Sequence, residues 1–293
     1  MMYNFIMRII TFKIDEKSAG MQIRDYLRGF GVSSALLTKL KQTENGITKN
    51  GVFAKAIEKI ECGDELTICI KSEGTMPKPA DLPLNIIYED EDVLALNKPA
   101  AMPVHESRNH RGDTLSNAVA NYMKGKRDSA FRAVFRLDRD TSGIVLTAKN
   151  ELAAAKLAGK IKKDYYAVVC GEIAGKGTID APIRRLGDSI IKRGVFEDGD
   201  SAITHYESIK TNGKYTLLKI NLETGRTHQI RVHFSNIGHP LAGDDLYGGS
   251  RADIARQALH CKAICFIHPV KGKEITLECD FPPDMEKLIE EMK

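Results

Sequence analysis

The chain has 293 residues, of which 42% are hydrophobic and 28% are charged, with a formal net charge of +4. This is the composition of a globular protein with a proper core, and the length suits one large domain or two unequal ones. No stretch approaches the roughly 18 unbroken apolar residues of a membrane span, so we expect no membrane association. The start, MMYNFIMRIITFKIDE, lacks a small-residue cleavage site. We therefore expect no signal peptide and a cytoplasmic location.

The positive charge is unevenly distributed along the chain. Residues 1–72 hold 11 Lys and Arg against 8 Asp and Glu, so most of the net charge lies in the first quarter. A mildly basic protein, with a pI of about 8.6, is compatible with a nucleic-acid partner. An ordinary solvated surface would also explain the excess.

The six cysteines are scattered, and in a reducing cytosol we expect free thiols. One group, His260, Cys261, Cys265 and His268, has residue types that bind metals. The pattern of residues 261–268 is typical of a buried strand, whose side chains alternate between two faces. The two cysteines would then share one face and the two histidines the other. Because four ligands must converge on a zinc ion, we expect no metal here.

Residues 1–72 are predicted to form a small α+β module. Apolar residues at helical spacing indicate a helix that Gly31 ends, and Ser33 or Ser34 can cap a second helix. Asn45-Gly46 and Asn50-Gly51 mark tight turns around short strands. Four basic side chains of the two helices are candidate RNA contacts: Arg24, Arg28, Lys39 and Lys41.

Two helices followed by a small basic hairpin resemble the alpha-L RNA-binding domain. A generic packing or dimerisation module would show the same pattern. Residues 73–84 hold three prolines and a glycine. Proline stiffens the chain and removes backbone donors, so we place an interdomain linker there and a second domain over 85–293.

The second segment is rich in strand patterns. NIIYEDEDVLALNKP indicates a hairpin that turns at Glu91-Asp92. Further β-branched or alternating runs follow, namely GIVLTAK, DYYAVVCGEI, AITHYESIK, KYTLLKINL and HQIRVHF. Helices are predicted only around 114–124, 151–161 and 283–292. Many strands and few helices favour an α+β domain built on a large, mostly antiparallel sheet.

Three polar clusters could carry chemistry. In the first, residues 136–143, the charge of two neighbouring arginines favours the ionised form of Asp138, and a carboxylate can act as nucleophile or base. The second, residues 224–233, is predicted as a strand with polar side chains on both faces, so it lines a cleft or lies at an edge. The third, residues 238–248, is predicted to be an ordered loop. Simple turn chemistry would also explain the first and third.

Other catalytic templates are missing. The sequence has no GxxxxGK[ST] phosphate loop, no GxGxxG after a strand, no HExxH and no GxSxG elbow. A carbohydrate hydrolase that pairs Asp138 with Asp244 cannot be rejected from spacing alone.

RLDRDTSGIVLTAKN resembles the signature of the RluA-type RNA pseudouridine synthases. Four further segments match this family in the same order, within residues 85–290: NKPAAMPVH, KDYYAVVCGEI, LETGRTHQIRVHFSNIGHPLAGDDLYG and RQALHCKAICFIHP. The resemblance implies the pseudouridine synthase fold, with a large mostly antiparallel sheet and a cleft. It also implies isomerisation of uridines in structured RNA, with no cofactor because the reaction is redox-neutral.

The resemblance also implies roles for individual residues. Asp138 would be the catalytic aspartate, with Arg226 paired to its carboxylate. Tyr165 would stack on the uracil and take part in proton removal from carbon five. The remaining three line or enter the site: Leu137 and Ile230 as apolar walls, and Arg136 to fill the gap left by the flipped nucleotide.

Some questions stay open at the level of sequence. Asp138 can be nucleophile or base. Phe135 stands where the family usually has histidine, and Ala101 where it usually has glycine. We expect a monomer that acts on large-subunit ribosomal RNA. Transfer RNA, or a non-catalytic role in binding RNA during ribosome assembly, are the alternatives.

Overall fold

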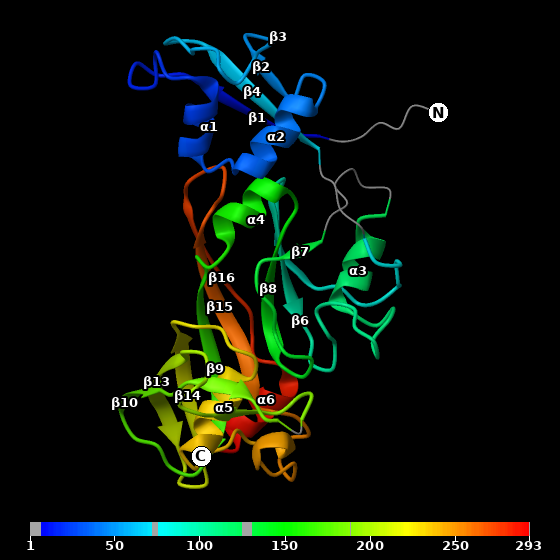
Figure 1. Cartoon of the computed structure of the whole chain (residues 1–293). Helices are drawn as coiled ribbons and strands as arrows, with labels where there is room; N and C mark the ends of the chain where they lie inside the picture. Colours follow the sequence, from blue (N-terminus) through cyan, green and yellow to red (C-terminus); the bar gives the residue numbers. More distant parts are fainter. Residues whose placement is uncertain (1–6, 72–75, 125–130, 188, 293) are drawn as a thin grey trace.

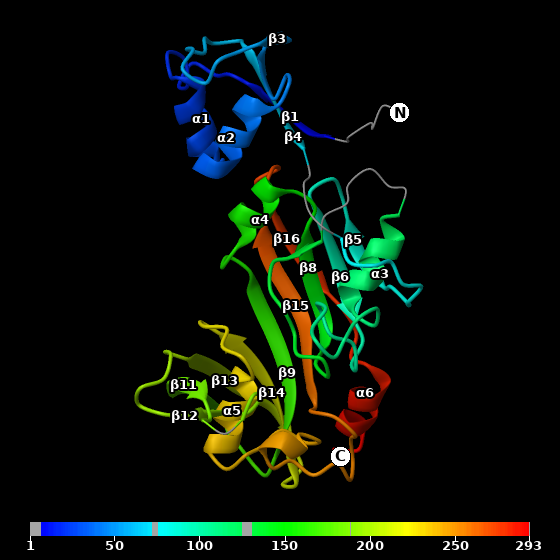
Figure 2. The same ribbon diagram turned by 45° about the vertical axis from the view of Figure 1, so that its right-hand side comes forward.

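The computed structural model describes residues 7–71, 76–124, 131–187 and 189–292. A small N-terminal module lies beyond one end of a larger domain, next to helix α4 (Glu151–Leu157) (Figure 1). The larger domain is built around one long sheet, which Figure 2 shows from a second side. Within the described residues, none of the helices has the length and apolar character that a bilayer crossing requires. The α+β fold predicted from the sequence is confirmed.

The N-terminal module is a four-stranded antiparallel sheet, ordered β1-β4-β2-β3, with two helices on one side (Figure 1). Its elements are β1 (Met7–Lys13), α1 (Ile23–Phe30), α2 (Ser34–Gln42), β2 (Ile47–Lys49), β3 (Val52–Phe53) and β4 (Glu65–Lys71). Residues 76–84, the described part of the expected linker, form neither helix nor strand, and residues 72–75 lie outside the described ranges.

The local sequence signals set the boundaries inside this module. Gly31 ends α1 with a φ of 105°, in the left-handed region where glycine has no Cβ to clash. Ser33 caps α2, because its hydroxyl accepts a hydrogen bond from the backbone N–H of Leu36 at 3.2 Å. Asn50 and Gly51, between β2 and β3, have φ of 53° and 78°, as a two-residue hairpin turn requires.

The sheet of the larger domain has the order β10-β13-β14-β9-β15-β8-β6-β5, with β16 beside β15 and β7 beside β8. Within the described residues its pairs are antiparallel except for β8 with β15. Its strands are β5 (Ile86–Glu89), β6 (Val93–Lys98), β7 (Arg132–Ala133), β8 (Ser142–Ala148), β9 (Lys162–Cys170), β10 (Lys176–Asp180), β13 (Ile203–Thr211), β14 (Tyr215–Leu222), β15 (Leu259–Ile267) and β16 (Glu274–Glu278). The hairpin predicted at Glu91-Asp92 joins β5 and β6.

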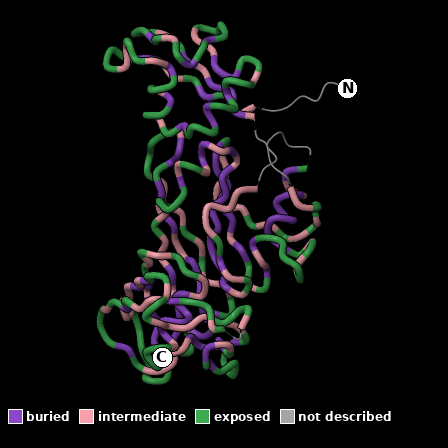
Figure 3. Tube along the Cα trace, viewed as in Figure 1, coloured by how far each residue is buried: buried purple, intermediate pink, exposed green. Residues whose placement is uncertain are grey.

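Smaller elements surround this sheet. They are α3 (Leu115–Tyr122), the separate hairpin of β11 (Ile183–Arg185) and β12 (Arg193–Val195), α5 (Gln229–Asn236), the 3-10 helix η1 (Asp245–Tyr247) and α6 (Pro283–Glu290). The core lies along the central strands, and every residue of β8 is buried. Figure 3 shows buried segments along the sheet and exposed segments at the outer loops.

The start of β8 is held close to β15 and β9. Gly143 pairs with Cys261 on β15, which in turn pairs with Tyr165 on β9. A Cβ at Gly143 would lie 2.2 Å from the carbonyl oxygen of Cys261, so only glycine permits this approach. The loop of residues 136–141, which precedes β8, is therefore fixed near Tyr165.

One predicted strand is wrong: residues 225–228 form a loop, and HQIRVHF continues into helix α5. His228 starts the helix with a left-handed φ of 60°. Gln229 fixes the preceding loop, because its Oε1 accepts the backbone N–H of Arg226 at 2.9 Å and its Nε2 donates to the carbonyl of Ile203 at 2.9 Å. Tertiary hydrogen bonds of this kind override a β-branched pattern.

Candidate active site

The larger domain has a pocket of about 280 Å³ between loop 136–141, β9 and the start of α5. Its lining combines ionisable and apolar side chains: Phe135, Arg136, Leu137, Asp138, Thr141, Lys163, Tyr165, Leu222, Gly225, Arg226, His228, Gln229, Ile230, Arg231 and Leu259. The volume is near the lower end for small-molecule sites. Pocket and polar lining together mark the candidate active site.

Asp138 is bound by an arginine that is itself anchored. Nη1 of Arg231 donates to Oδ2 of Asp138 at 3.2 Å, while its Nε and Nη2 donate to the two carboxylate oxygens of Asp244 at 2.7 and 2.8 Å. Asp244 is 1% exposed, and the Asp138 side chain is 24% exposed. Burial opposes the charge of Arg231, but its contacts with the two carboxylates raise its pKa. This arginine therefore stays charged and keeps the Asp138 carboxylate in place.

Arg226 does not pair with Asp138, and this expectation is corrected. Nε of Arg226 donates to the carbonyl of Ser201 at 3.0 Å, and its Nη1 lies 3.9 Å from Oδ2 of Asp200. The family resemblance implied that Arg226 makes this pair, whereas the structure gives the contact to Arg231. In the structure Arg226 lies in the loop before α5, whereas Arg231 lies in the first turn of the helix, where its guanidinium reaches Asp138.

His228 is a second basic side chain beside Asp138. Its Nε2 lies 3.7 Å from Oδ2 of Asp138, and its Nδ1 meets the hydroxyl of Tyr247 at 2.8 Å. Burial lowers the pKa of His228, although the charge of Asp138 acts in the opposite direction. A neutral imidazole at neutral pH follows. Asp244 and Tyr247 both come from the predicted ordered loop of residues 238–248, and the structure brings both close to Asp138 through Arg231 and His228.

Tyr165 forms a wall of the pocket from strand β9. It is 6% exposed. Burial raises its pKa well above 10, with further contributions from Cys261 and Asp138. The phenol therefore stays protonated at neutral pH, and the ring offers an apolar face to whatever occupies the pocket.

Lys98, from the NKPAAMPVH segment, fixes the loop that carries Asp138. Its ammonium group donates to the carbonyl oxygens of Pro99, Met102 and Arg139 at 2.7 to 2.9 Å. Burial lowers the pKa of Lys98 to about 7. Three carbonyl acceptors explain why a lysine is tolerated in the core.

Comparison with known proteins identifies the family of this chain. Residues 92–236 match the family described as RNA pseudouridylate synthase. A Bacillus subtilis (strain 168) protein named uncharacterized RNA pseudouridine synthase YjbO is 41% identical over 281 residues, which cover 92% of this chain and 98% of that relative. The chain belongs to the RNA pseudouridine synthase family. The RluA-type resemblance is confirmed, and the chain is an isomerase that forms pseudouridine in RNA.

A further relative supports the same family, and a solved structure shares the fold. Ribosomal large subunit pseudouridine synthase D of Escherichia coli (strain K12) is 37% identical over 263 residues, which cover 83% of this chain and 81% of that relative. The fold is shared with human RNA pseudouridylate synthase domain containing 1, with a TM-score of 0.58 and 23% identity over 74% of this chain and 97% of that one.

The remaining residues expected at the site of the synthase surround the pocket. Leu137 and Ile230 are buried and line it. Arg136 is exposed beside it, and its Nη2 donates to the hydroxyl of Thr227 at 3.0 Å. Phe135, a departure from the family pattern, also lines the pocket and lies 4.9 Å from the ammonium group of Lys163.

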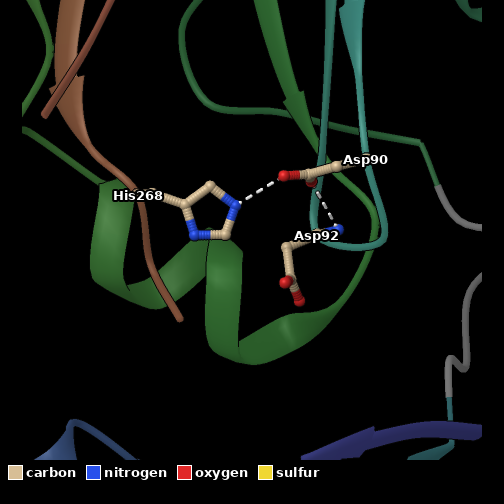
Figure 4. A group of neighbouring side chains, drawn as sticks. All are labelled: Asp90, Asp92 and His268. Atoms are coloured by element: carbon tan, nitrogen blue, oxygen red, sulfur yellow. Dashed lines mark hydrogen bonds and ion pairs between the residues drawn. The ribbon is translucent and has the colours of Figure 1, made fainter. Parts of the chain in front are cut away.

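One group of side chains in the described ranges has the spacing of metal ligands: Asp90, Asp92 and His268 (Figure 4). Each is already engaged. Asp90 binds His268 at 2.7 Å and Lys271 at 2.9 Å, and Arg8 binds both oxygens of Asp92 at 2.9 and 2.8 Å. Two side-chain cations already balance the two carboxylates, so this group joins protein segments and gives no ground for a metal site.

The four cysteine and histidine candidates do not converge either. Nδ1 of His260 meets the hydroxyl of Ser142 at 2.9 Å, whereas Nε2 of His268 meets Asp90. Cys261 is fully buried beside Tyr165. The two histidines thus lie in different surroundings, and the spacing carries no metal proposal.

The four candidate RNA contacts of the N-terminal module differ in their partners. Arg24 and Arg28 are about half exposed and share Asp25, at 3.6 and 4.0 Å. Lys39 contacts Glu151 of the larger domain at 2.7 Å, so it takes part in the junction between the two parts. Lys41 is exposed.

Proposed function

We propose that this synthase isomerises uridines of large-subunit ribosomal RNA and that Asp138 is its single catalytic carboxylate. The observation that carries this proposal is the composition of the pocket. Among its lining residues Asp138 is the only carboxylate, and Arg231, itself anchored by the buried Asp244, donates a hydrogen bond to it. Either a nucleophile or a base must be ionised and must face the substrate, so the geometry suits both roles.

The pocket size dictates how the substrate enters. A space of about 280 Å³ accommodates a single nucleotide base and excludes a paired one, so the target uridine must leave its stack. Leu137 and Ile230 then supply apolar contact, and the ring of Tyr165 packs against the base. Arg136, exposed beside the pocket, is placed to occupy the gap left in the RNA.

The reaction itself breaks one bond and forms another. The bond between uracil nitrogen N1 and ribose carbon C1′ is cleaved, the base turns, and carbon C5 joins C1′. The proton lost from C5 is balanced by one gained at N1, so no electrons are exchanged. Asp138 either attacks the sugar or accepts a proton, and the charge of Arg231 stabilises the carboxylate throughout.

Tyr165 and His228 support the proton transfer in different ways. Because Tyr165 stays protonated, we propose that it stacks on the base and donates or relays a proton. His228 is neutral and 3.7 Å from Asp138, so it can exchange a proton with the carboxylate or with the base.

The choice of ribosomal RNA rests on the relatives and on the N-terminal module. Several relatives are named ribosomal large subunit pseudouridine synthase D. We propose that residues 7–71 act as an additional RNA-binding module, with Arg24, Arg28 and Lys41 facing the RNA. A large structured RNA offers room for a second contact of this kind.

The hydrolase alternative has no support in the geometry. Asp244 is buried, both its oxygens are bound by Arg231, and it does not line the pocket. A general acid must reach the substrate, and Asp244 cannot. The other two alternatives, a transfer RNA substrate and a role in RNA binding without catalysis, are separated from the proposal by the following experiment.

The test maps pseudouridines in total RNA from cells with and without this gene. Sites in large-subunit ribosomal RNA should disappear in the deletion, return with the wild-type gene, and stay absent with Asp138→Asn. Asp140→Asn is the matched control, because Asp140 lies on the same loop but pairs with Arg139 at 3.0 Å outside the pocket. Restoration by Asp138→Asn would refute the catalytic assignment, and sites lost only from transfer RNA would refute the substrate.

A further inference from the structure

A second, cation-rich groove adjoins the catalytic pocket. It has a volume of about 380 Å³ and shares Gly225 and Arg226 with the pocket. Its other lining residues come from the β11–β12 hairpin and the segments beside it: Ile183, Arg184, Arg185, Arg193, Asp200 and Thr227. The lining thus contains four arginines and a single aspartate. This excess of positive charge points to an anionic ligand.

The arginines are only partly neutralised within the protein. Arg184 pairs with Asp198 at 2.7 Å and stacks on the ring of Phe196 at 3.7 Å. Arg226 has only a distant contact of 3.9 Å with the mostly exposed Asp200. Arg185 and Arg193 make no ion pair with any residue that the structure describes.

Arg193 gives an independent sign of a missing partner. Its Nη1 atom is buried and, among the described residues, has no hydrogen-bond partner. Buried polar atoms are nearly always paired, and a guanidinium is suited to two oxygens of one phosphate. The unpaired atom therefore fits a site that is completed by a ligand.

Hydrogen bonds connect the groove to the candidate active site. The backbone N–H of Arg193 donates to the hydroxyl of Tyr247 at 3.0 Å, and the same hydroxyl meets Nδ1 of His228 at 2.8 Å. His228 in turn lies beside Asp138. A ligand bound by Arg193 would therefore be connected to Asp138 through Tyr247 and His228.

We propose that this groove binds the RNA backbone next to the extruded uridine, with Arg193 and Arg185 contacting phosphodiester oxygens. The inference rests on the proposed function, because the groove continues the pocket that takes the uridine. It also gives Arg226 a role at the boundary between base pocket and backbone groove, in place of the pairing with Asp138.

The test measures how the affinity of the full-length protein for a large-subunit ribosomal RNA transcript varies with salt. Each lost phosphate contact lowers the slope of log K against log salt by roughly 0.7 to 0.9. Arg193→Gln should show this loss and bind about 5- to 10-fold more weakly at moderate salt. Arg193→Lys keeps the positive charge but loses the guanidinium that can bind two oxygens at once. It should therefore retain the slope and only part of the affinity.

Lys287→Gln is the matched control, because it removes one positive charge from the exposed side of α6, away from the hairpin (Figure 2). It should keep the wild-type slope. A wild-type slope for Arg193→Gln would refute the proposal that the groove binds the RNA backbone. Pseudouridine formation by the wild type is scored separately: an active wild type with an unaltered Arg193→Gln slope refutes the groove alone, and a wild type that binds but forms no product refutes the proposed function.

Discussion

Asp138 and Asp244 are bound by the same guanidinium, that of Arg231, although they lie on separate loops. Two nitrogens of Arg231 donate to the buried Asp244, and the third donates to the partly exposed Asp138. The pocket therefore has a carboxylate whose orientation depends on a second carboxylate that does not line the pocket.

Asp244→Asn should reduce both stability and turnover. A buried charge that loses its partner costs about 3 kcal/mol, and a weakened charge-assisted contact to Asp138 should lower kcat about 10- to 100-fold. Urea unfolding and single-turnover kinetics measure the two effects. The control is Asp245→Asn, whose exposed pair with Arg251 should contribute less than about 1 kcal/mol. Equal effects of the two variants would contradict this account.

Stability should fall in acid partly through His260. Burial, followed by the charges of Lys262 and Arg256, lowers the pKa of this histidine to about 4, below its ordinary value of about 6.5. The unfolded chain therefore binds the proton first, and stability is lost as the pH falls from about 6.5 to about 4, by up to about 3 kcal/mol. His260→Gln should flatten this part of the profile of unfolding free energy against pH.

The control for that measurement is His205→Gln, which changes a histidine that is 41% exposed on β13. His205 pairs with Glu223 at the surface, so this replacement should change the unfolding free energy at neutral pH by less than about 1 kcal/mol. If His260→Gln kept the wild-type slope of unfolding free energy against pH, the acid sensitivity would have another origin.

Ala101→Gly should stabilise the protein. Ala101 is exposed and has a φ of 60°, in the left-handed region that costs an L-residue about 1 to 2 kcal/mol. Glycine removes this cost but adds freedom to the unfolded chain, so we expect a net gain of roughly 0.5 to 1 kcal/mol. Thermal and urea unfolding measure it. Ala158→Gly, at an exposed site with a φ of −54°, should instead destabilise by a similar amount.

Asp92→Asn should loosen the junction between the N-terminal module and the larger domain. Arg8 binds both oxygens of this fully buried carboxylate, and a buried arginine–carboxylate pair that loses one charge costs about 3 kcal/mol. We expect the module to unfold at lower urea than the larger domain, as two transitions in circular dichroism. Glu91→Gln removes an exposed carboxylate that contacts the same arginine at 3.0 Å and should leave the unfolding curve nearly unchanged.

Much of the secondary structure could be predicted because it depends on local chemistry. Gly31, Ser33 and the Asn50-Gly51 turn act through their own backbone or that of near neighbours, and the structure places the boundaries where these residues indicate. The family motifs likewise pointed to Asp138 and Tyr165, which both line the pocket. The notable local error was the segment HQIRVHF, which was predicted as a strand and forms most of helix α5.

The partner of Asp138 was decided only by tertiary structure. Alternation along a strand separates His228 from Arg231, whereas a helix that begins at His228 brings both to the same carboxylate. That helix start depends on hydrogen bonds from Gln229 to residues distant in the sequence, which no local pattern contains. The sequence by itself determined the family, the α+β class and the loop that carries Asp138 into the pocket. The choice of Arg231 over Arg226, and the buried anchor of Asp244 beneath it, required packing between segments far apart in the chain.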